Sequence, residues 1–446
     1  MPEIDERIAA VNERMVPEVK AGMMAAEAHD FPVRAWPPNW ESAKHVDYFY
    51  RSGSVLTRDA DAPRVARTLE NLPTAASGAD GAGGVMTAGQ ARSPIKGVTC
   101  FETSVSDSWH TYDTVEELEK RLGLGVVSHE HVFTITPWVF CPATEPEPVF
   151  EPQQALTPEL VTDALWPPPA DPAAGRGVRV SVVDTGLLRG VEGWAPWLAG
   201  VIPDSREDVE DPDTFNVDEH VPHPDGFADP YAGHGSFIAG VIRCVAPQAE
   251  VVVERLIGTS GFVSETDMIQ QIHQGLSRSP DIISLSAGGH TRKDVPPIGL
   301  QALWNERLSR QGGVVLVAAA GNNTSSRPFW PAAFDWCVGV GSMSHDGQRR
   351  SWFSNFGSWL DVYAPGEDIV NVYPQLRYKT IAHRNERDTS AGIVKWSGTS
   401  FATPIVTGLI AARMSRTGES GRLAAESLLA AARSQFRPGI GPRLFP

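Results

Sequence analysis

The chain of 446 residues is poor in positive charge and in long apolar runs, and each shortage excludes a class of protein. Its 38 Lys and Arg residues stand against 54 Asp and Glu residues, which gives a formal net charge of -16. A nucleic-acid partner is therefore not expected, because binding to phosphates requires a basic surface. No window approaches the roughly 18 consecutive apolar residues of a membrane helix, so no membrane association is expected either.

Cysteine is also scarce, and its spacing argues against a zinc site. The four cysteines are Cys100, Cys141, Cys244 and Cys337, and no two of them form a C-x-x-C pair. The N-terminus has no basic start followed by an apolar stretch, so no secretory signal is visible. These two observations predict reduced thiols and a cytoplasmic location, although sequence alone leaves a disulfide open.

The first 138 residues are predicted to form a small α+β domain. Helices are expected after Asp61, with Val65 and Leu69 on one face, and after Thr114, which fits a capping box with Glu117. Strands are expected at Ser54–Thr57, Val98–Phe101 and Val132–Ile135. The order of elements is strand, helix, strand, helix, strand.

A change of composition predicts two further units. Residues 139–174 are rich in Pro, Glu and Ala and are interpreted as a linker. In residues 175–446, short β-branched runs such as VRVSVVD, DIISLSA and VVLVAAAGN alternate with helical stretches. Continuous apolar strands separated by helices predict an α/β domain whose parallel sheet is covered on both faces. In such sheets, functional groups gather at the carboxyl ends of the strands.

Four polar residues stand where chemistry is expected, although each alone has a plain structural reading. Asp184 ends a strand, which is common in α/β enzymes. His234 precedes an apolar helix, whose dipole disfavours protonation and suits a general base, but a surface histidine fits the same pattern. Asn322 is either a turn former or a donor to an oxyanion. Ser400 is either an N-cap or a nucleophile.

Five motifs in order carry a resemblance to a known family. They are V-V-D-T-G, H-G-S-F-I-A-G, S-A-G-G, A-A-G-N and G-T-S-F-A-T-P. From Gly175 onward the sequence resembles the subtilisin-like serine proteases, or subtilases. The resemblance implies an α/β catalytic domain with a mostly parallel sheet flanked by helices, and a serine endopeptidase that acts on polypeptides.

The resemblance also implies a role for each of the four residues. Ser400 would be the nucleophile, His234 its general base, and Asp184 the group that orients the imidazole. Asn322 would donate its amide to the oxyanion, together with the backbone N–H of Ser400.

Substrate-binding residues follow from the same resemblance. Ser286, Ala287 and Gly288 would form the edge along which an extended substrate pairs, and Gly289 would lie at the rim of the primary pocket. A loose alignment on the Trp330-Pro331 pair places Phe329 near the floor of this pocket, which leaves cleavage specificity open.

The chain departs from the family pattern at two positions and carries one unusual insertion. Phe237 and Ile405 stand where many members have histidine, but neither position is catalytic. No cofactor is required. Many members bind calcium, yet the acidic insertion at 204–229 shows no regular ligand spacing and also fits a solvated loop or a field that favours basic substrates.

Two rival functions and two roles of the N-terminal domain stay open. The chain could be a catalytically silent interaction protein with the subtilase fold. It could also be an aspartic protease that uses Asp184 in its D-T-G triplet, but such enzymes need a second carboxylate and the chain has no second D-T-G. Residues 1–138 resemble a prodomain that inhibits or chaperones the catalytic domain, and a partner-sensing domain is the alternative.

Overall fold

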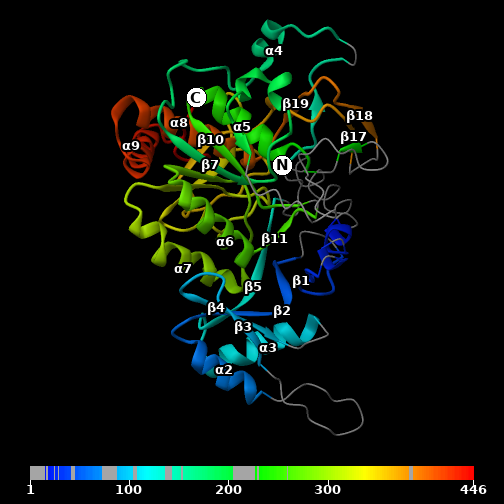
Figure 1. Cartoon of the computed structure of the whole chain (residues 1–446), viewed down its shortest axis with the longest axis vertical. Helices are drawn as coiled ribbons and strands as arrows, with labels where there is room; N and C mark the ends of the chain where they lie inside the picture. Colours follow the sequence, from blue (N-terminus) through cyan, green and yellow to red (C-terminus); the bar gives the residue numbers. More distant parts are fainter. Residues whose placement is uncertain are drawn as a thin grey trace.

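The structure is a computed structural model of the whole chain (Figure 1). It describes residues 16, 19–24, 26–28, 30–41, 46–72, 88–103, 108–135, 143–151, 154–203, 227–228, 231–258, 260–380 and 385–446. A small sheet with two helices lies at the bottom of the view, and a larger α/β body lies above it.

The larger body is built on a parallel sheet of seven strands in the order β15-β14-β13-β12-β7-β10-β8. The strands are β7 (Arg179–Asp184), β8 (Ile202–Pro203), β10 (Glu250–Arg255), β12 (Ile282–Leu285), β13 (Val315–Ala319), β14 (Cys337–Met343) and β15 (Val362–Pro365). The predicted α/β fold with a parallel sheet is confirmed.

Helices cover both faces of this sheet. Val180 and Val182 of β7 belong to the core that contains helices α5 (His234–Val245), α8 (Thr399–Thr417) and α9 (Gly421–Ser434). Their neighbour Val183 belongs to the opposite core, with α6 (Glu265–Gly275) and α7 (Ile298–Glu306). Because both faces are buried, the strands are mostly apolar, which explains the apolar runs in the sequence.

Within the described residues, the larger body also contains two small three-stranded sheets and five short 3-10 helices. One sheet joins β16 (Ile369–Val372), β19 (Ile393–Trp396) and β6 (Glu147–Pro148), and the other joins β18 (Glu386–Asp388), β17 (Arg377–Lys379) and β9 (Phe227–Ala228). The 3-10 helices are Val191–Gly193, Pro196–Leu198, Leu276–Arg278, Arg292–Asp294 and Leu308–Arg310.

The described part of the Pro-rich segment 139–174 packs on the larger body. It contributes β6 and the helix α4 (Pro158–Ala164), in which Thr157 caps the N-terminus by accepting the Leu160 N–H. Phe150 and Val161 form a small core with Ile393 of β19. These buried apolar side chains hold the segment against the body, which its composition did not indicate.

The N-terminal region forms an antiparallel sheet with helices on one face. Its strands are β1 (Val33–Trp36), β2 (Tyr48–Arg58), β3 (Ala88–Arg92), β4 (Val98–Thr103) and β5 (Val127–Thr134), and the helices on that face are α2 (Ala62–Glu70) and α3 (Ser108–Leu122). Further helical residues are described at 19–24 and 26–28. The three strands expected from the sequence lie within β2, β4 and β5, with Ile135 just beyond the last.

The helix starts in this region differ in detail from the sequence prediction. α2 begins after Asp61 as expected, but the Asp61 carboxylate pairs with Arg64 instead of capping the helix. The capping box at Thr114 is wrong, because α3 begins at Ser108 and Thr114 lies inside it, 5% exposed. Packing of the helix on the sheet extends it past a residue whose local preference is for an N-terminus.

The small sheet shares its core with the larger body. Leu56 of β2 and Val98 of β4 belong to the same apolar cluster as Met268 and Ile272 of α6. The opposite face of the small sheet packs on α2 and α3. A sixth strand, β11 (Phe262–Ser264), joins this sheet from the larger body by pairing antiparallel with β5. The N-terminal region therefore contacts the larger body through one face of its sheet and also through one edge of that sheet.

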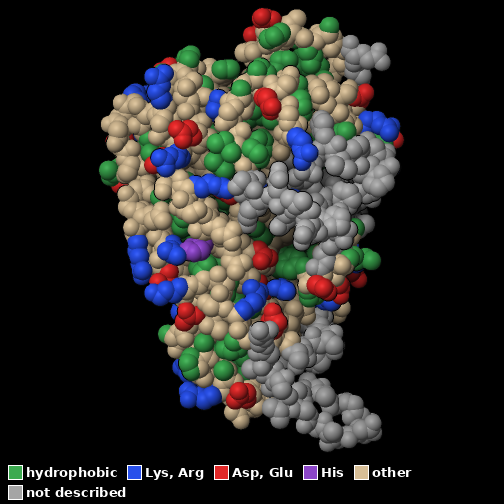
Figure 2. Space-filling view, in the orientation of Figure 1, with side chains coloured by type: hydrophobic (Ala, Val, Ile, Leu, Met, Phe, Trp, Pro, Cys, Tyr) green, Lys and Arg blue, Asp and Glu red, His purple; other side chains and the backbone are tan. Residues whose placement is uncertain are grey.

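The surface carries mixed charge on the face drawn in Figure 2. Lys and Arg side chains are interspersed with Asp and Glu over the parts of that face that the structure describes. Within the described residues, none of the helices combines the length and apolar content needed to cross a bilayer.

Candidate active site

Asp184 is placed by the end of the central strand β7. Its side chain is fully buried, and its Oδ1 accepts the backbone N–H of Thr185 at 2.8 Å. The same oxygen lies 2.7 Å from Nδ1 of His234. A carboxylate that accepts from Nδ1 holds the imidazole in the tautomer whose Nε2 can take a proton.

His234 is the first residue of α5 and is fully buried. The helix start can approach β7 because position 235 is glycine, since a Cβ there would lie 2.5 Å from the Gly186 carbonyl oxygen. The imidazole packs at 5.5 Å from the ring of Phe401, the residue that follows Ser400. Asp184 thus contacts His234, and His234 in turn contacts the residue that follows Ser400.

Ser400 lies in the first turn of α8 and is 1% exposed. Pro404 stands four residues later and has no N–H to donate to the Ser400 carbonyl. That carbonyl accepts instead from the Ser286 hydroxyl at 3.0 Å. The proline therefore leaves an acceptor open in the helix, and a residue of the predicted substrate edge fills it.

Asn322 follows β13, and its side-chain oxygen is fixed. Oδ1 accepts from both the backbone N–H and the hydroxyl of Thr399, each at 2.9 Å. The Thr399 hydroxyl in turn accepts from the Gly321 N–H at 3.2 Å. With its oxygen bound beside Ser400, the amide is oriented so that its NH₂ group lies on the other side, as a donor to an oxyanion requires.

The predicted substrate edge, Ser286 to Gly289, directly follows β12. Ser286 and Ala287 are buried, at 3% and 2% exposed. Gly289 exchanges two backbone hydrogen bonds with Trp330, both 2.9 Å long. Glycine is required at 288, because a Cβ would lie 2.4 Å from the Trp330 carbonyl oxygen. Of the four predicted substrate-binding residues, Ser286 contacts the serine segment directly, and Gly288 and Gly289 lie against the Phe329–Trp330 segment.

The end of β5 pairs with this edge. Thr134 and Gly288 exchange backbone hydrogen bonds of 3.0 and 3.2 Å in an antiparallel bridge. On its other side, the same stretch of β5 pairs with β11, with Thr134 opposite Phe262. A strand of the N-terminal region thus lies between two segments of the larger body, where the sequence placed an extended substrate.

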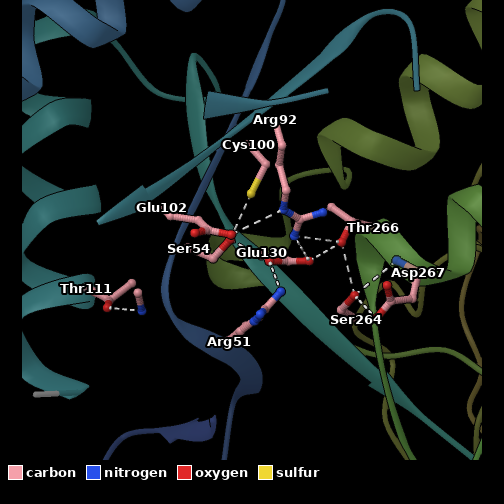
Figure 3. A network of polar contacts seen from close by, with 11 residues as sticks. Arg51, Ser54, Arg92, Cys100, Glu102, Thr111, Glu130, Ser264, Thr266 and Asp267 are labelled. Carbon is pink, nitrogen blue, oxygen red and sulfur yellow. Dashed lines mark hydrogen bonds and ion pairs between the residues drawn. The ribbon is translucent and has the colours of Figure 1, made fainter. Parts of the chain in front are cut away.

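A buried carboxylate, Glu130, links β5 to the start of α6 (Figure 3). Its side chain is fully buried and accepts from the hydroxyls of Ser54, in β2, and Thr266, in the first turn of α6. The guanidinium groups of Arg51 and Arg92 lie 3.7 and 3.5 Å away. Two cations and the positive end of a helix stabilise this carboxylate.

Two neighbours of Glu130 have shifted pKa values. Burial raises the pKa of Asp267, which lies in the first turn of α6. Burial also raises the pKa of the Cys100 thiol to about 11, so this cysteine is protonated at neutral pH and is a poor nucleophile. Cys244 and Cys337 are likewise free and buried, whereas Cys141 lies outside the described residues.

A histidine next to Glu130 forms a second link between the two parts. The Nε2 atom of His131 accepts the backbone N–H of Arg292 at 3.2 Å, and its Nδ1 lies 3.4 Å from the carboxylate of Glu265. Glu265, the first residue of α6, also accepts the Gly299 N–H in the first turn of α7. Both ring nitrogens of His131 therefore lie beside polar groups of the larger body.

The two residues that differ from the family pattern lie in the core. Phe237 is fully buried and packs at 4.5 Å from the Phe401 ring, and Ile405 is fully buried in the same cluster. Most of the acidic insertion at 204–229 lies outside the described residues. Among the residues that are described, no group of three or more His, Cys, Asp or Glu side chains is arranged to hold a metal ion.

The sequence analysis missed three residues that contribute to the candidate active site. The pairing of Thr134 with Gly288 joins residues far apart in the chain, and nothing in the local pattern of β5 indicates it. Thr399 orients Asn322, although the sequence marks it only as part of G-T-S. The Pro404 of the same motif could have indicated an unpaired carbonyl at Ser400, since a proline inside a helix removes one hydrogen bond.

The chain is similar to known peptidases over this body. A family model described as "Subtilase family" matches residues 175–433. Thermitase from Thermoactinomyces vulgaris is 30% identical over 287 residues, which are 64% of this chain and 91% of thermitase. The major intracellular serine protease of Bacillus subtilis (strain 168) is 29% identical over 261 residues, 55% of this chain and 71% of that protein.

A solved structure extends the likeness in fold to most of the chain. Fervidolysin from Fervidobacterium pennivorans, described as a keratinolytic enzyme related to subtilisin, matches with a TM-score of 0.55. The match covers 89% of this chain and 60% of that chain, at 18% identity. At this identity the likeness concerns the fold alone.

Proposed function

Because the chain belongs to the subtilase family of serine peptidases, we propose that it is a serine endopeptidase in which Ser400 is the nucleophile, His234 the general base and Asp184 the group that orients it. Ser400 would attack the carbonyl carbon of a peptide bond while His234 takes its proton, and the protonated His234 would then give that proton to the leaving amine. In the second half of the reaction, His234 would take a proton from water as the water attacks the acyl carbon, and it would then return that proton to the Ser400 oxygen as the acyl group leaves.

The observation that carries this proposal is the convergence of four segments. The Asp184–His234 hydrogen bond of 2.7 Å, the packing of His234 on Phe401 and the double bond of Asn322 to Thr399 all meet at the start of α8. The alternative of a catalytically silent interaction protein gains no support, because all four candidate catalytic positions carry the residue types that the chemistry needs. The aspartic alternative gains none either, because Asp184 bonds an imidazole rather than a second carboxylate.

Substitution of the nucleophile tests the proposal. Ser400→Ala should abolish peptide hydrolysis and labelling by a fluorophosphonate probe, leaving only the roughly 10³–10⁴-fold rate enhancement over water that other groups supply. Ser397→Ala is the matched control, because this buried serine precedes α8 in the same segment and accepts the Asp368 N–H. If Ser400→Ala kept its activity or its labelling, the assignment would be wrong.

We further propose that the N-terminal region, residues 1–138, limits access of substrates to Ser400. The end of β5 occupies the backbone donors and acceptors of Gly288 that an extended substrate would use, and it also pairs with β11. The Glu130 and His131 contacts hold it there. A role as a folding aid is compatible with the shared core, because the small sheet buries part of α6.

The expected setting is the cytoplasm. Two relatives carry the word "intracellular" in their names, from Paenibacillus polymyxa and Bacillus subtilis. The thiols of Cys100, Cys244 and Cys337 are free in the structure. A peptidase in that compartment needs a means of control, which the occupied substrate edge would supply.

A further inference from the structure

The ring of Phe329 fills the space between two backbone segments of the candidate active site. It is 2% exposed. One side of the ring faces Gly288, where an added Cβ would lie 2.5 Å from the Phe329 Cε1 atom. The other side faces Gly321, where an added Cβ would lie 2.9 Å from Cε2. The ring therefore spans the whole distance between these two glycines.

Those two segments flank the place of one particular substrate residue. The acyl residue, defined as the one whose carbonyl carbon Ser400 attacks, must lie beside Ser286, which bonds the Ser400 carbonyl. Its carbonyl oxygen must point toward Asn322, which directly follows Gly321. Its side chain is thereby directed between the Ser286–Gly288 segment and the Gly321–Asn322 segment, where the Phe329 ring lies.

The ring is held in this place by its neighbours. The backbone of the next residue, Trp330, is fixed to Gly289 by two hydrogen bonds of 2.9 Å. The ring of His290 meets Phe329 edge-on at 5.4 Å, and its Nδ1 donates to the Pro328 carbonyl at 2.9 Å. Burial lowers the pKa of His290 to about 4, so this bond persists unchanged across neutral pH. These contacts fix the position of the Phe329 ring.

We infer that Phe329 determines specificity by closing the primary pocket, so that the enzyme cleaves after small residues such as Gly, Ala and Ser and discriminates against Leu, Phe and other large acyl residues. This inference rests on the proposed function, because it concerns the same site. A large side chain would have to displace a buried ring packed between two backbones, which overpacks the site. Differences of this kind in an apolar pocket give about 10–200-fold discrimination.

The test compares peptide substrates that differ only in the acyl residue. The full-length protein should show a kcat/KM at least about tenfold higher for Gly or Ala than for Leu or Phe. An N-terminal region that blocks the site would lower every kcat/KM by the same factor, so the ratios between substrates are unaffected. If Leu or Phe substrates were cleaved as well as Ala substrates, the inference would be overturned.

Two variants test whether Phe329 causes the preference for small acyl residues. Phe329→Ala should raise the ratio of kcat/KM for Leu and Phe substrates to kcat/KM for Ala substrates about tenfold or more. Phe334→Ala removes another buried ring, which stacks on Trp336 in the core, and it should leave the ratios unchanged. A Phe329→Ala protein that changes all substrates equally would contradict the inference.

The outcomes also separate this inference from the proposed function. Absence of fluorophosphonate labelling in both the original protein and a Glu130→Gln protein, in which the N-terminal region should dock less tightly, would overturn the serine mechanism itself. Normal labelling with a preference for large acyl residues would overturn only the role of Phe329. Should Phe329→Ala fail to fold, the substrate ratios of the original protein still decide the question.

Discussion

At the scale of single residues, hydrogen bonds from neighbouring side chains fix the Ser400 carbonyl and the Asn322 amide at the candidate active site. Pro404 lacks the N–H that would bind the Ser400 carbonyl, and Ser286 donates to it instead. The Asn322 oxygen is bound by Thr399, which fixes the plane of the amide. Such preorganisation matters because a donor that is already oriented costs no reorganisation when charge develops.

Removal of the Asn322 amide donor should slow the reaction without weakening substrate binding. Asn322→Ala is expected to lower kcat by roughly 10²–10³ with little change in KM, a range carried over from the loss of such a donor in a subtilisin. Asn322→Asp keeps an oxygen for Thr399 but lacks the NH₂ group, so it should lose kcat as well. Steady-state kinetics of both variants provide the measurement.

The neighbouring asparagine supplies the control for that prediction. Asn323 lies next in the chain, and its side-chain oxygen accepts from Asn355. Asn323→Ala should therefore change kcat far less. A normal kcat with a raised KM in the Asn322 variants would point to a role in substrate binding instead.

At the scale of elements, the contact between β5 and α6 joins the two parts of the molecule. The Glu130 carboxylate reaches Thr266 in the first turn of α6 and lies near Arg51 and Arg92 of its own region (Figure 3). Loss of a buried charge that other groups are arranged to pair leaves those groups unsatisfied, and it costs more than loss of a surface pair.

Neutralisation of Glu130 should therefore weaken docking of the N-terminal region and raise activity. For Glu130→Gln we expect about a tenfold increase in kcat/KM toward short peptides, which corresponds to about 1.4 kcal/mol of lost docking free energy. Rates should be expressed per active site, counted by probe labelling, so that an effect on folding yield is separated from inhibition.

Glu102→Gln is the matched control for this variant. Glu102 also lies beside Arg92, at 3.7 Å, but its side chain is 53% exposed, so its charge is well solvated. This variant should leave kcat/KM within about twofold. A Glu130→Gln protein with unchanged or lowered activity per active site would argue against an inhibitory role for the N-terminal region.

At the scale of the whole molecule, docking should depend on pH through one buried histidine of β5, His129. Burial is the main cause that holds the pKa of His129 well below its ordinary value, and His131 and Arg292 lower it further. His129 is fully buried, with its ring stacked on Tyr50 at 4.4 Å. The docked state thus accepts a proton less readily than an open state in which this histidine is solvated.

The sign of the pH effect follows from that difference. Above about pH 6.5, His129 is neutral in both states and has no effect. As the pH falls below that value, the open state takes up a proton that the docked state cannot, so docking weakens progressively. Hydrogen exchange of the β5 amides in the Ser400→Ala protein, corrected for intrinsic rates, should therefore speed up between pH 7.5 and about pH 5.

Replacement of the histidine should reduce this response. His129→Phe keeps an aromatic ring against Tyr50 but cannot be protonated, so exchange of β5 should depend less on pH. His345→Gln changes an exposed histidine of the larger body and should behave as the original protein does. Equal acid sensitivity in all three proteins would exclude His129 as the responsible group.

The sequence by itself determined the parallel sheet and the four polar residues at the site. Strands covered on both faces are rich in apolar residues, so β7, β12 and β13 were recognisable from composition alone. Asp184 and Asn322 end or follow such strands, and parallel strands bring their carboxyl ends to one edge. These features are local, because each depends on residues within a few positions of one another.

Only the tertiary structure decided what lies against that site. Thr266 bonds Glu130 from 136 positions away, and Thr134 meets Gly288 across a still longer separation, so no periodicity in either segment indicates the pairing. The same holds for Phe329, whose ring closes the space between Gly288 and Gly321. A sequence pattern records which side chains are buried, whereas the partners of a buried side chain are set by the packing of distant segments.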